Sequence, residues 1–210
     1  MATSISPREA RLRTGLKYFN RSMLLLWRLS LGGWLNSWPA VGGRIMVLTT
    51  IGRTSGRLRR TPLNYAIVDD EVYCTAGFGS ISDWYRNIRA NPEVEVWLPD
   101  GWWVGLAQEV TDPVARLPLL REVLIGSGIV APLVGVDPHT LTDDALAAAT
   151  ASYHLLRIDR TEARTGAGGP GDLAWVWPMS TVAALLLLAR SRRQSAQGHA
   201  GGKHYGNSPH

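Results

Sequence analysis

Residues 45–65 read I-M-V-L-T-T-I-G-R-T-S-G-R-L-R-R-T-P-L-N-Y, and this stretch decides the fold of the chain. Ile45 to Ile51 is an apolar, β-branched run of strand length, and Gly52 to Gly56 has the Gly, Ser and Thr of a turn. Thr61 to Val68, with Pro62 near its start, resumes a strand-like pattern. We therefore predict a β-hairpin whose turn begins at Gly52.

The turn of this hairpin and its exit are strongly basic. No acidic residue lies between its four arginines, which are Arg53, Arg57, Arg59 and Arg60. Guanidinium forks, backbone N–H groups and the hydroxyls of Thr54 and Ser55 can together bind an anion. A phosphate or a polycarboxylate tail suits this chemistry. The residue types leave open a second interpretation, in which the hairpin is basic and simply solvated.

The composition is that of a folded protein with an uneven charge distribution. The chain has 210 residues, 45% of them hydrophobic and 19% charged, which predicts one domain or at most two small ones. Residues 1–60 carry 11 Lys/Arg and one acid, residues 61–172 carry 7 and 16, and residues 173–210 carry 4 and none. Basic ends indicate an anionic partner such as lipid headgroups or a charged cofactor. Nucleic acid is not predicted, because aromatic residues do not alternate with the hairpin arginines.

Several kinds of site are excluded by their missing motifs. The chain has no G-x-G-x-x-G after a strand, no G-x-x-x-x-G-K-[ST] and no G-x-S-x-G. No His/Cys group has zinc spacing, so no metal site is predicted. His139 and His154 are interpreted as structural or surface residues. Cys74, the single cysteine, lies in an apolar strand pattern and is predicted to be a buried, inert thiol in a reducing compartment.

Beyond the hairpin the chain predicts an antiparallel β meander decorated by helices. Predicted strands are Pro62–Val68, Glu71–Ala76, Val94–Leu98, Trp102–Val110 and Tyr153–Ile158. Predicted helices are Asp83–Ala90 with Ser82 as N-cap, Pro113–Ile125 and Thr142–Ala151, with residues 126–138 as a loop. This order predicts an α+β protein built on a small β-barrel and excludes the alternating pattern of a Rossmann fold.

The two ends differ from the barrel. We predict an N-terminal amphipathic helix and loop (1–40, helix at 7–31), a cofactor-binding barrel domain (41–160), a Gly-rich linker (161–172), an apolar helix (173–193) and a disordered tail (194–210). The first helix either packs on the domain or lies on a membrane surface. The run 173–189 carries no formal charge and is either a short tail anchor or a docked helix.

Two separated motifs resemble a known family. They are V-L-T-T-I-G-R-T-S-G-R-L-R-R-T-P-L at residues 47–63 and D-W-Y-R-N-I-R-A-N-P-E-V-E-V at residues 83–96. Together they resemble the deazaflavin (coenzyme F420)-dependent nitroreductases, also described as F420-dependent quinone reductases. The resemblance covers roughly Val47 to Val110, with a weaker match to about Asp159. It implies a split β-barrel like that of the FMN-binding pyridoxamine-phosphate oxidases.

The resemblance also implies a cofactor site. The hairpin would hold the phosphate and glutamate tail of the deazaflavin, strand residues would line its tricyclic ring, and the short helix would close the pocket. For Trp84 and Tyr85, core packing is the open alternative. The implied cofactor-binding residues are Arg53, Thr54, Ser55, Gly56 and Arg59 for the tail, Pro62, Asn64, Tyr65, Ala76, Gly77 and Phe78 for the ring, and Trp84, Tyr85 and Asn87 for closure.

This sequence departs from the family pattern at three places. Thr54 stands where many relatives have a Lys, and a second Lys that some relatives carry near Phe78 is absent. Arg57 and Arg60 are candidates to replace those charges. Nitroreducing members use a Tyr in the substrate pocket after the second helix, and no Tyr lies between Leu124 and Asp144 here. This last difference argues against nitro compounds as acceptors.

The implied activity is an F420-dependent oxidoreductase that passes a hydride from C5 of the reduced deazaflavin to a quinone or a nitro compound. No catalytic side chain is assigned, and Tyr65, Ser80 or water would supply a proton. The apolar ends favour a lipid-soluble quinone and a cytoplasmic protein at the inner face of the membrane. Split barrels of this type are often dimers, which implies a homodimer. Two alternatives stay open: a non-enzymatic carrier of F420 or lipid, and an FMN- or haem-binding split barrel.

Overall fold

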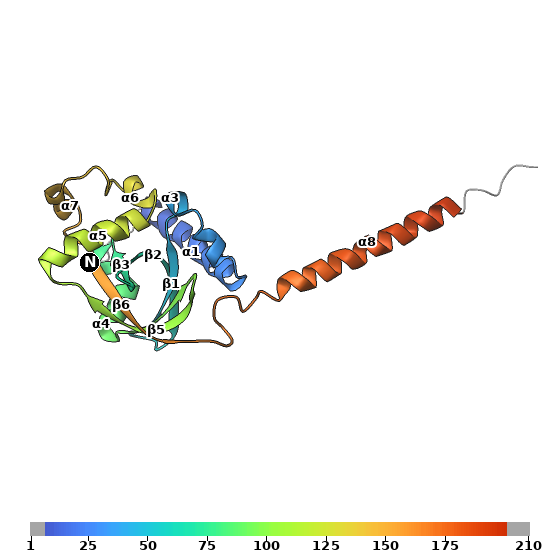
Figure 1. Cartoon of the computed structure of the whole chain (residues 1–210), viewed down its shortest axis with the longest axis horizontal. Coiled ribbons are helices and arrows are strands. Elements are labelled where there is room, and N and C mark those ends of the chain that lie inside the picture. The colour runs from blue at the N-terminus through green and yellow to red at the C-terminus, as the bar shows by residue number, and fades with distance from the viewer. Residues whose placement is uncertain (1–6, 201–210) are drawn as a thin grey trace, which may run out of the picture. The chain divides into compact units, whose positions relative to one another are not determined.

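Six strands close into one antiparallel barrel in the order β1-β2-β3-β6-β5-β4 (Figure 1). The structure is a computed structural model that describes the backbone of residues 7–200 and the side chains of residues 18–39 and 42–191. The predicted barrel of the α+β kind is confirmed. The strands are β1 Ile45–Ile51, β2 Leu58–Val68, β3 Glu71–Ala76, β4 Glu93–Leu98, β5 Gly101–Glu109 and β6 His154–Ala163.

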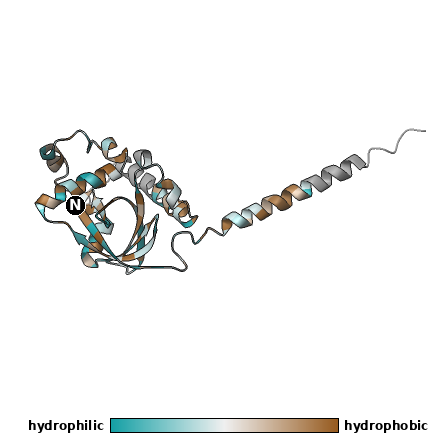
Figure 2. Cartoon of the chain, in the orientation of Figure 1, coloured by the Kyte–Doolittle hydropathy of each residue, from teal (hydrophilic) through white to brown (hydrophobic). Residues whose placement is uncertain are grey.

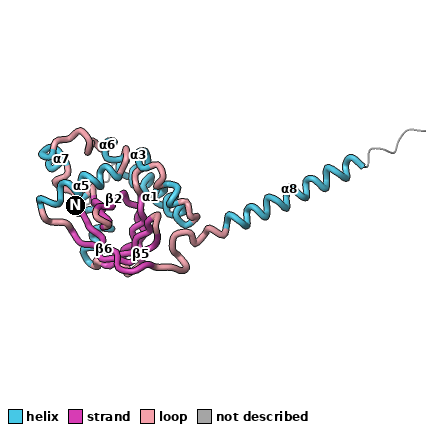
Figure 3. Tube along the Cα trace, viewed as in Figure 1, coloured by secondary structure: helices cyan, strands magenta, loops and turns pink. Residues whose placement is uncertain are grey.

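Helices flank the barrel, as the cyan and magenta segments of Figure 3 show. Helices α1 and α5 contact β2 from outside, and α4 contacts β1. The helices are α1 Pro7–Arg28, α2 Gly32–Leu35, α3 Pro39–Gly42, α4 Asp83–Ala90, α5 Pro113–Gly126, α6 Val130–Leu133, α7 Asp143–Ala149 and α8 Val176–Ala200, with the 3-10 turn η1 at Gly79–Ile81.

The strand register places several chain segments at one end of the barrel, which we call the hairpin end. Ile51 pairs with Leu58 there, at the turn between β1 and β2. Ala76 at the end of β3 pairs with His154 at the start of β6, and Glu109 at the end of β5 pairs with Leu156. Helix α4 follows β3 and precedes β4, so it crosses the barrel at this end.

The barrel is open along part of its wall. Strand β2 pairs with β3 only from Tyr65 to Val68. Its preceding residues, Leu58 to Asn64, pair with β1 alone. Proline suits this stretch, because Pro62 has no N–H to offer a second neighbour. We call the gap between residues 58–64 of β2 and the end of β3 the split.

Three buried clusters hold the fold together. The barrel interior contains Met46, Leu48, Tyr65, Val96 and Ile158 among others. A second cluster joins α5 to the outer face of β2, β3 and β6, and a third joins α1 to β1, β4 and β5 through tryptophans. The N-terminal helix therefore packs on the barrel, at least through Leu24 and Trp27. It ends at Arg28 instead of the predicted Leu31, because Ser30 adopts φ 64° and Leu31 N donates to Leu26 O at 2.9 Å.

Two strands are longer than predicted. Strand β2 begins at Leu58, ahead of the predicted Thr61 or Pro62, and β6 continues to Ala163. Pairing with Thr49 and Thr50 draws Arg59 and Arg60 into the sheet although they break the apolar alternation. The predicted Gly-rich linker at 161–172 is therefore wrong for its first three residues, which belong to β6.

The remainder of that segment is a strap packed on the barrel and not a loose connection. Residues 164–172, the strap, cross the third cluster: Gly171 N donates to Trp27 O at 3.0 Å and Gly168 O accepts from Arg60 Nη2 at 2.6 Å. The Arg28 guanidinium donates to both carboxylate oxygens of Asp172 at 2.8 Å. A Cβ on Gly169 would lie 2.5 Å from the Trp102 ring, so glycine permits this close approach.

The chain divides into two units, with the boundary between Asp172 and Leu173. The second unit contains α8, whose middle is apolar (Figure 2). Helix α8 continues to Ala200, so the predicted disorder is wrong for residues 194–200, where Gln and Ala are good helix formers. Residues 201–210 lie outside the described part. Between residues 7 and 200, no helix combines the length and apolar character needed to cross a membrane.

Candidate functional site

The turn between β1 and β2 is compact and exposes cations. Gly52 N donates to Arg57 O at 2.9 Å, and Ser55 and Gly56 donate their N–H groups back to Gly52 O. A Cβ on Gly52 would lie 2.8 Å from Ser55 Oγ, so glycine allows the turn to close. The N–H groups of Ser55 and Gly56 are thus used inside the turn. Hydroxyl and guanidinium groups are left to meet a ligand.

The arginines of the turn are not equivalent. Arg53 Nη1 forms an ion pair with Asp83 Oδ1 at 3.1 Å. Arg60 donates to the strap and its guanidinium lies 4.7 Å from the centre of the Trp97 ring, so it does not replace a missing lysine of the cradle. Arg57 and Arg59 are exposed, and neither forms an ion pair with any described residue. These two side chains are the cations available to an anionic ligand.

Asn87 fastens this turn to α4. Its side chain is buried, its Oδ1 accepts from Arg53 N at 3.1 Å and from Arg53 Nη1 at 3.3 Å, and its Nδ2 donates to Thr50 Oγ1 at 3.2 Å. The Asn87 amide therefore hydrogen-bonds to the backbone and side chain of Arg53 in the turn and to the side chain of Thr50 in β1. Ser82 occupies the predicted N-cap position of α4, but its side chain makes no capping hydrogen bond.

Replacing Asn87 by alanine is expected to lower the free energy of unfolding by about 2–3 kcal/mol, because Arg53 N–H and the buried Thr50 hydroxyl lose their partner. Urea unfolding followed by circular dichroism measures the change. Asn91→Ala is the matched control, since its Oδ1 accepts one hydrogen bond, from Glu93 N, at an exposed position. Equal losses in the two variants would contradict the role given to Asn87.

The ring-lining residues of the prediction flank the split. Pro62 and Asn64 lie on the stretch of β2 that does not pair with β3, and Ala76, Gly77 and Phe78 lie across from it at the end of β3. Tyr65 belongs to the barrel interior, where burial raises the pKa of its phenol. Asn64 Nδ2 donates to Arg44 O at 3.2 Å, which ties this edge to the segment before β1.

The two aromatic residues of α4 face the barrel core. Trp84 packs on the interior cluster, and Tyr85 is 2% exposed. The Tyr85 hydroxyl donates to Glu109 Oε2 at 2.8 Å, and its ring stacks on His154 at 4.3 Å between centroids. His154 Nδ1 lies 2.6 Å from Glu109 Oε1. This trio, Tyr85, Glu109 and His154, joins α4 to β5 and β6, and the sequence did not reveal it.

The trio makes stability sensitive to acid. Burial is the largest influence on Glu109 and raises its pKa, but hydrogen bonds from Tyr85 and His154 outweigh burial, so the pKa lies below the ordinary 4.5. A carboxylate whose pKa is lowered by folding stabilises the fold above its unfolded pKa, and the contribution is lost as pH falls through the folded value. Because the Glu109 side chain is partly exposed and solvent screens its interactions, we expect Glu109→Gln to lower the free energy of unfolding by only about 0.5–1 kcal/mol at pH 7, and by progressively less below pH 4.5.

Melting temperatures of the wild type and Glu109→Gln between pH 3 and pH 7 measure this difference. Glu93→Gln, at an exposed position on β4, is the control. A constant gap between wild type and Glu109→Gln across that range would contradict the argument. Cys74, in contrast, is fully buried, and burial raises the pKa of its thiol to about 12, as expected for an inert cysteine.

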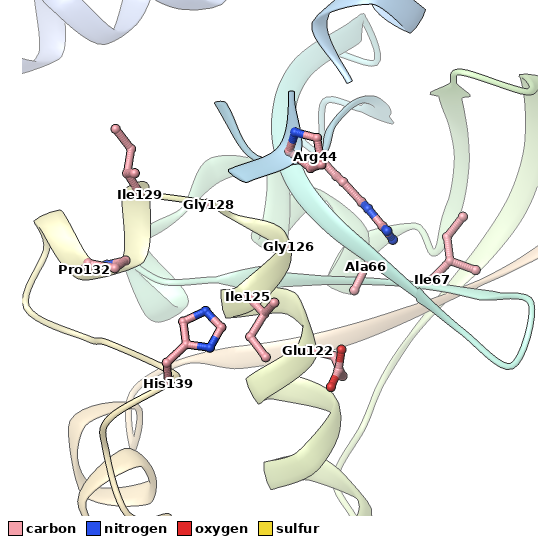
Figure 4. Close-up of a pocket in the computed structure, with 11 residues that line it drawn as sticks. Arg44, Ala66, Ile67, Glu122, Ile125, Gly126, Gly128, Ile129, Pro132 and His139 are labelled. Atoms are coloured by element: carbon pink, nitrogen blue, oxygen red, sulfur yellow. The ribbon is translucent and has the colours of Figure 1, made fainter. Parts of the chain in front are cut away.

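A groove of about 500 Å³ lies beside the C-terminal end of β2, where Ala66 and Ile67 line it (Figure 4). It shares no residue with the predicted cofactor site. Its wall is mostly apolar, with Arg44, Glu122 and His139 as its ionisable groups. The lining residues are Pro39, Arg44, Ala66, Ile67, Glu122, Ile125, Gly126, Gly128, Ile129, Pro132 and His139.

The C-terminal end of helix α5 approaches β2 closely beside this groove, at Gly126. Arg44 N donates to Gly126 O at 2.6 Å, and a Cβ on Gly126 would lie 2.6 Å from Tyr65 O. The groove therefore begins where the split edge of β2 ends. Sequence reasoning missed it, because its residues come from four separate segments and no local pattern marks them.

The predicted residues thus fall into two neighbouring groups. The hairpin end brings together the turn, the end of β3 and α4, while Pro62, Asn64 and Tyr65 lie further along β2. Exposed guanidinium groups at the turn and an unpaired strand edge beside it fit the polyanionic tail and the flat ring of a deazaflavin coenzyme. Within the described residues, no cluster of His, Cys, Asp or Glu could hold a metal ion.

Comparison with known proteins matches residues 27–123 to the family model described as F420H(2)-dependent quinone reductase. Similar solved structures include the conserved hypothetical protein Rv2991 from Mycobacterium tuberculosis, at 21% identity over 67% of this chain and 91% of that one, with a TM-score of 0.44. An F420-H2 dependent reductase, FDR-A, is 21% identical over 55% and 93% of the two chains, with a TM-score of 0.39. At these identities and TM-scores, the structural likeness carries no information about substrates.

Proposed function

We propose, on the premise that residues 27–123 belong to the F420H(2)-dependent quinone reductase family, that this chain reduces a lipid-soluble quinone with reduced F420. That family consists of F420-dependent oxidoreductases, so F420 is the cofactor. The quinone, the binding residues and contact with the inner face of the membrane are the finer parts of the proposal, as is a homodimer.

The observation that carries the proposal is the order of groups along one strand. Arg59 lies near the start of β2 beside the basic turn, Pro62 and Asn64 lie on the split edge, and Ala66 and Ile67 line the groove. At about 3.3 Å per residue, Arg59 and Ile67 are separated by roughly 26 Å. An anionic tail, a planar ring and an acceptor can therefore bind side by side along β2.

In this arrangement the protein binds and positions its ligands. When bound, the reduced deazaflavin supplies a hydride to the acceptor. Arg57 and Arg59 would bind the anionic tail, and the split edge of β2 together with the end of β3 would hold the ring. The apolar wall of the groove excludes water from the acceptor, and Arg44 offers a positive charge where negative charge develops on a quinone oxygen.

The lining of the groove favours a quinone over a nitro compound. The resemblance places the acceptor pocket of nitroreducing relatives after the second helix and assigns a Tyr to it. Here the corresponding segment contributes Ile125, Ile129 and Pro132 to the groove. An aliphatic wall suits the apolar body of a lipid-soluble quinone.

Fluorescence titration of the full chain with oxidised F420, and in parallel with FMN, at two salt concentrations tests the cofactor. Dissociation constants in the micromolar range or tighter for F420, weakened by salt, are expected. Quinone reduction is then followed by loss of reduced F420. Binding of FMN alone would overturn the proposal, and F420 binding without turnover of any quinone would favour the carrier alternative.

A further inference from the structure

The groove opens between two surface segments that carry no ionisable side chain. Residues 29–43 and residues 123–136 contain no Asp, Glu, Lys, Arg or His. Pro39 lines the groove from the first segment. Ile129 and Pro132 line it from the second (Figure 4). Two stretches far apart in the sequence therefore meet at one opening, and both are uncharged.

Large apolar side chains of these segments are exposed to solvent. Six of them, which we call the apolar rim, are 44% to 77% exposed: Trp34, Trp38, Ile129, Val130, Leu133 and Val134. Single exposed apolar residues are common on soluble proteins, whereas a group around a groove indicates a contact surface. The apolar rim is therefore expected to contact an apolar partner.

The charged residues that precede and follow the first segment in the sequence indicate the chemistry of this partner. Arg21 on α1 is exposed, and Arg44 lines the groove and is exposed as well, as are the other two ionisable residues of the groove wall, Glu122 and His139. No acidic residue lies between residues 18 and 44. Tryptophans next to arginines are typical of the boundary between lipid headgroups and hydrocarbon, where cations meet anionic headgroups.

We propose that the apolar rim inserts into the surface of an anionic lipid bilayer, so that the groove opens directly into the lipid. This inference rests on the proposed function, because a lipid-soluble acceptor then enters the groove from the bilayer without crossing water. The uncharged segments permit this contact, since no carboxylate or ammonium group of theirs has to be desolvated. Arg21 remains at headgroup level and limits the depth of insertion.

A single attached fluorophore reports the contact. Cys74 is buried and its thiol is inert, so Leu133→Cys gives one reactive cysteine in the full chain. We expect an environment-sensitive dye at residue 133 to shift its emission to shorter wavelength on addition of vesicles of phosphatidylcholine and phosphatidylglycerol, and less with phosphatidylcholine alone. Val114→Cys, 84% exposed on the first turn of α5, is the matched position and should show no shift.

A double variant tests how much the apolar rim contributes to the binding of vesicles. Leu133→Asp with Val134→Asp should lower vesicle partitioning at least about tenfold, because two apolar side chains leave the bilayer. Val114→Asp should leave partitioning unchanged. The rim variant should also lose reduction of a long-chain quinone in vesicles while F420 affinity and reduction of a short-chain quinone in solution stay within about twofold.

Three results would overturn the inference. The first is an unshifted dye at residue 133 with vesicles. The second is a shift without vesicles that grows with protein concentration, which would make the rim a contact between two copies. The third is loss of partitioning only in Leu186→Asp with Leu187→Asp on α8. Failure of F420 binding or of short-chain quinone reduction would overturn the proposed function instead, whatever the vesicles show.

Discussion

Replacing Arg57 and Arg59 together by alanine is expected to weaken F420 binding about thirtyfold to a hundredfold, at roughly 1–1.5 kcal/mol for each exposed guanidinium. Neither side chain forms an ion pair with a described residue, so neither has to leave a partner to bind the coenzyme. Arg53, in contrast, is already paired with Asp83, and its replacement would also disturb the contact with Asn87. The double variant therefore isolates the anion contact.

The salt dependence of the titration provides the sharper readout. Contacts between exposed charges weaken with ionic strength, so the double variant should lose most of the salt dependence that the wild type shows. Arg21→Ala, which removes an exposed arginine from α1, is the control and should bind F420 as the wild type does. Unchanged affinity in the double variant would show that the tail of the coenzyme lies elsewhere.

Replacing Trp97 by alanine is expected to lower the free energy of unfolding by about 3–5 kcal/mol. Trp97 is fully buried in β4, where it meets Trp102 edge to face at 6.5 Å between centroids and lies under the Arg60 guanidinium. It also belongs to the cluster that holds α1 on the barrel through Trp27. Its loss should therefore loosen α1 and the strap together with the sheet.

Trp97→Phe separates ring volume from hydrogen bonding. The indole N–H of Trp97 makes no hydrogen bond to any residue that the structure describes, so phenylalanine removes none of those bonds and should cost about 1–2 kcal/mol for the smaller ring. Urea unfolding followed by far-UV circular dichroism compares the three proteins. A loss in Trp97→Phe as large as in Trp97→Ala would mean that the N–H has an important partner after all.

The elements whose bounds were predicted correctly are flanked by residues that favour a turn or end a helix. Strand β3 ends a hairpin whose turn, Asp69-Asp70, adopts φ 51° and 66°, the left-handed region that Asp tolerates. Helix α4 lies between Ser82 and Asn91-Pro92 and matches its predicted range. In both cases the flanking residues restrict the backbone conformation locally. The bounds of the element can therefore be predicted from neighbouring residues in the sequence.

The rest of the fold depends on contacts that local patterns do not contain. The loop predicted at 126–138 includes α6, a single turn whose N-cap residue, Ile129, has no side-chain hydrogen bond to the helix. The start of β2 depends on pairing with β1, and the strap depends on Trp27 and Trp102. The ends of long elements are thus set by tertiary contacts, which is where the prediction failed.

In the candidate site, too, local sequence patterns predicted some features, whereas others depend on tertiary contacts. The basic turn could be predicted because its four arginines lie between residues 53 and 60, whereas their unequal roles depend on Asp83, Trp97 and the strap. The trio of Tyr85, Glu109 and His154 joins three elements, and its members are separated by 24 to 69 residues. No spacing rule for helices or strands connects residues so far apart.

The strap determines where this chain can be shortened. Secondary structure alone would place the end of the barrel at Ala163, the last residue of β6. A chain cut there would expose the rings of Trp27 and Trp102 to water and leave Arg28 without Asp172. A chain that ends at Asp172 would keep both. The nine residues after the final strand are therefore part of the smallest piece that can be expected to fold, although they contain no regular structure.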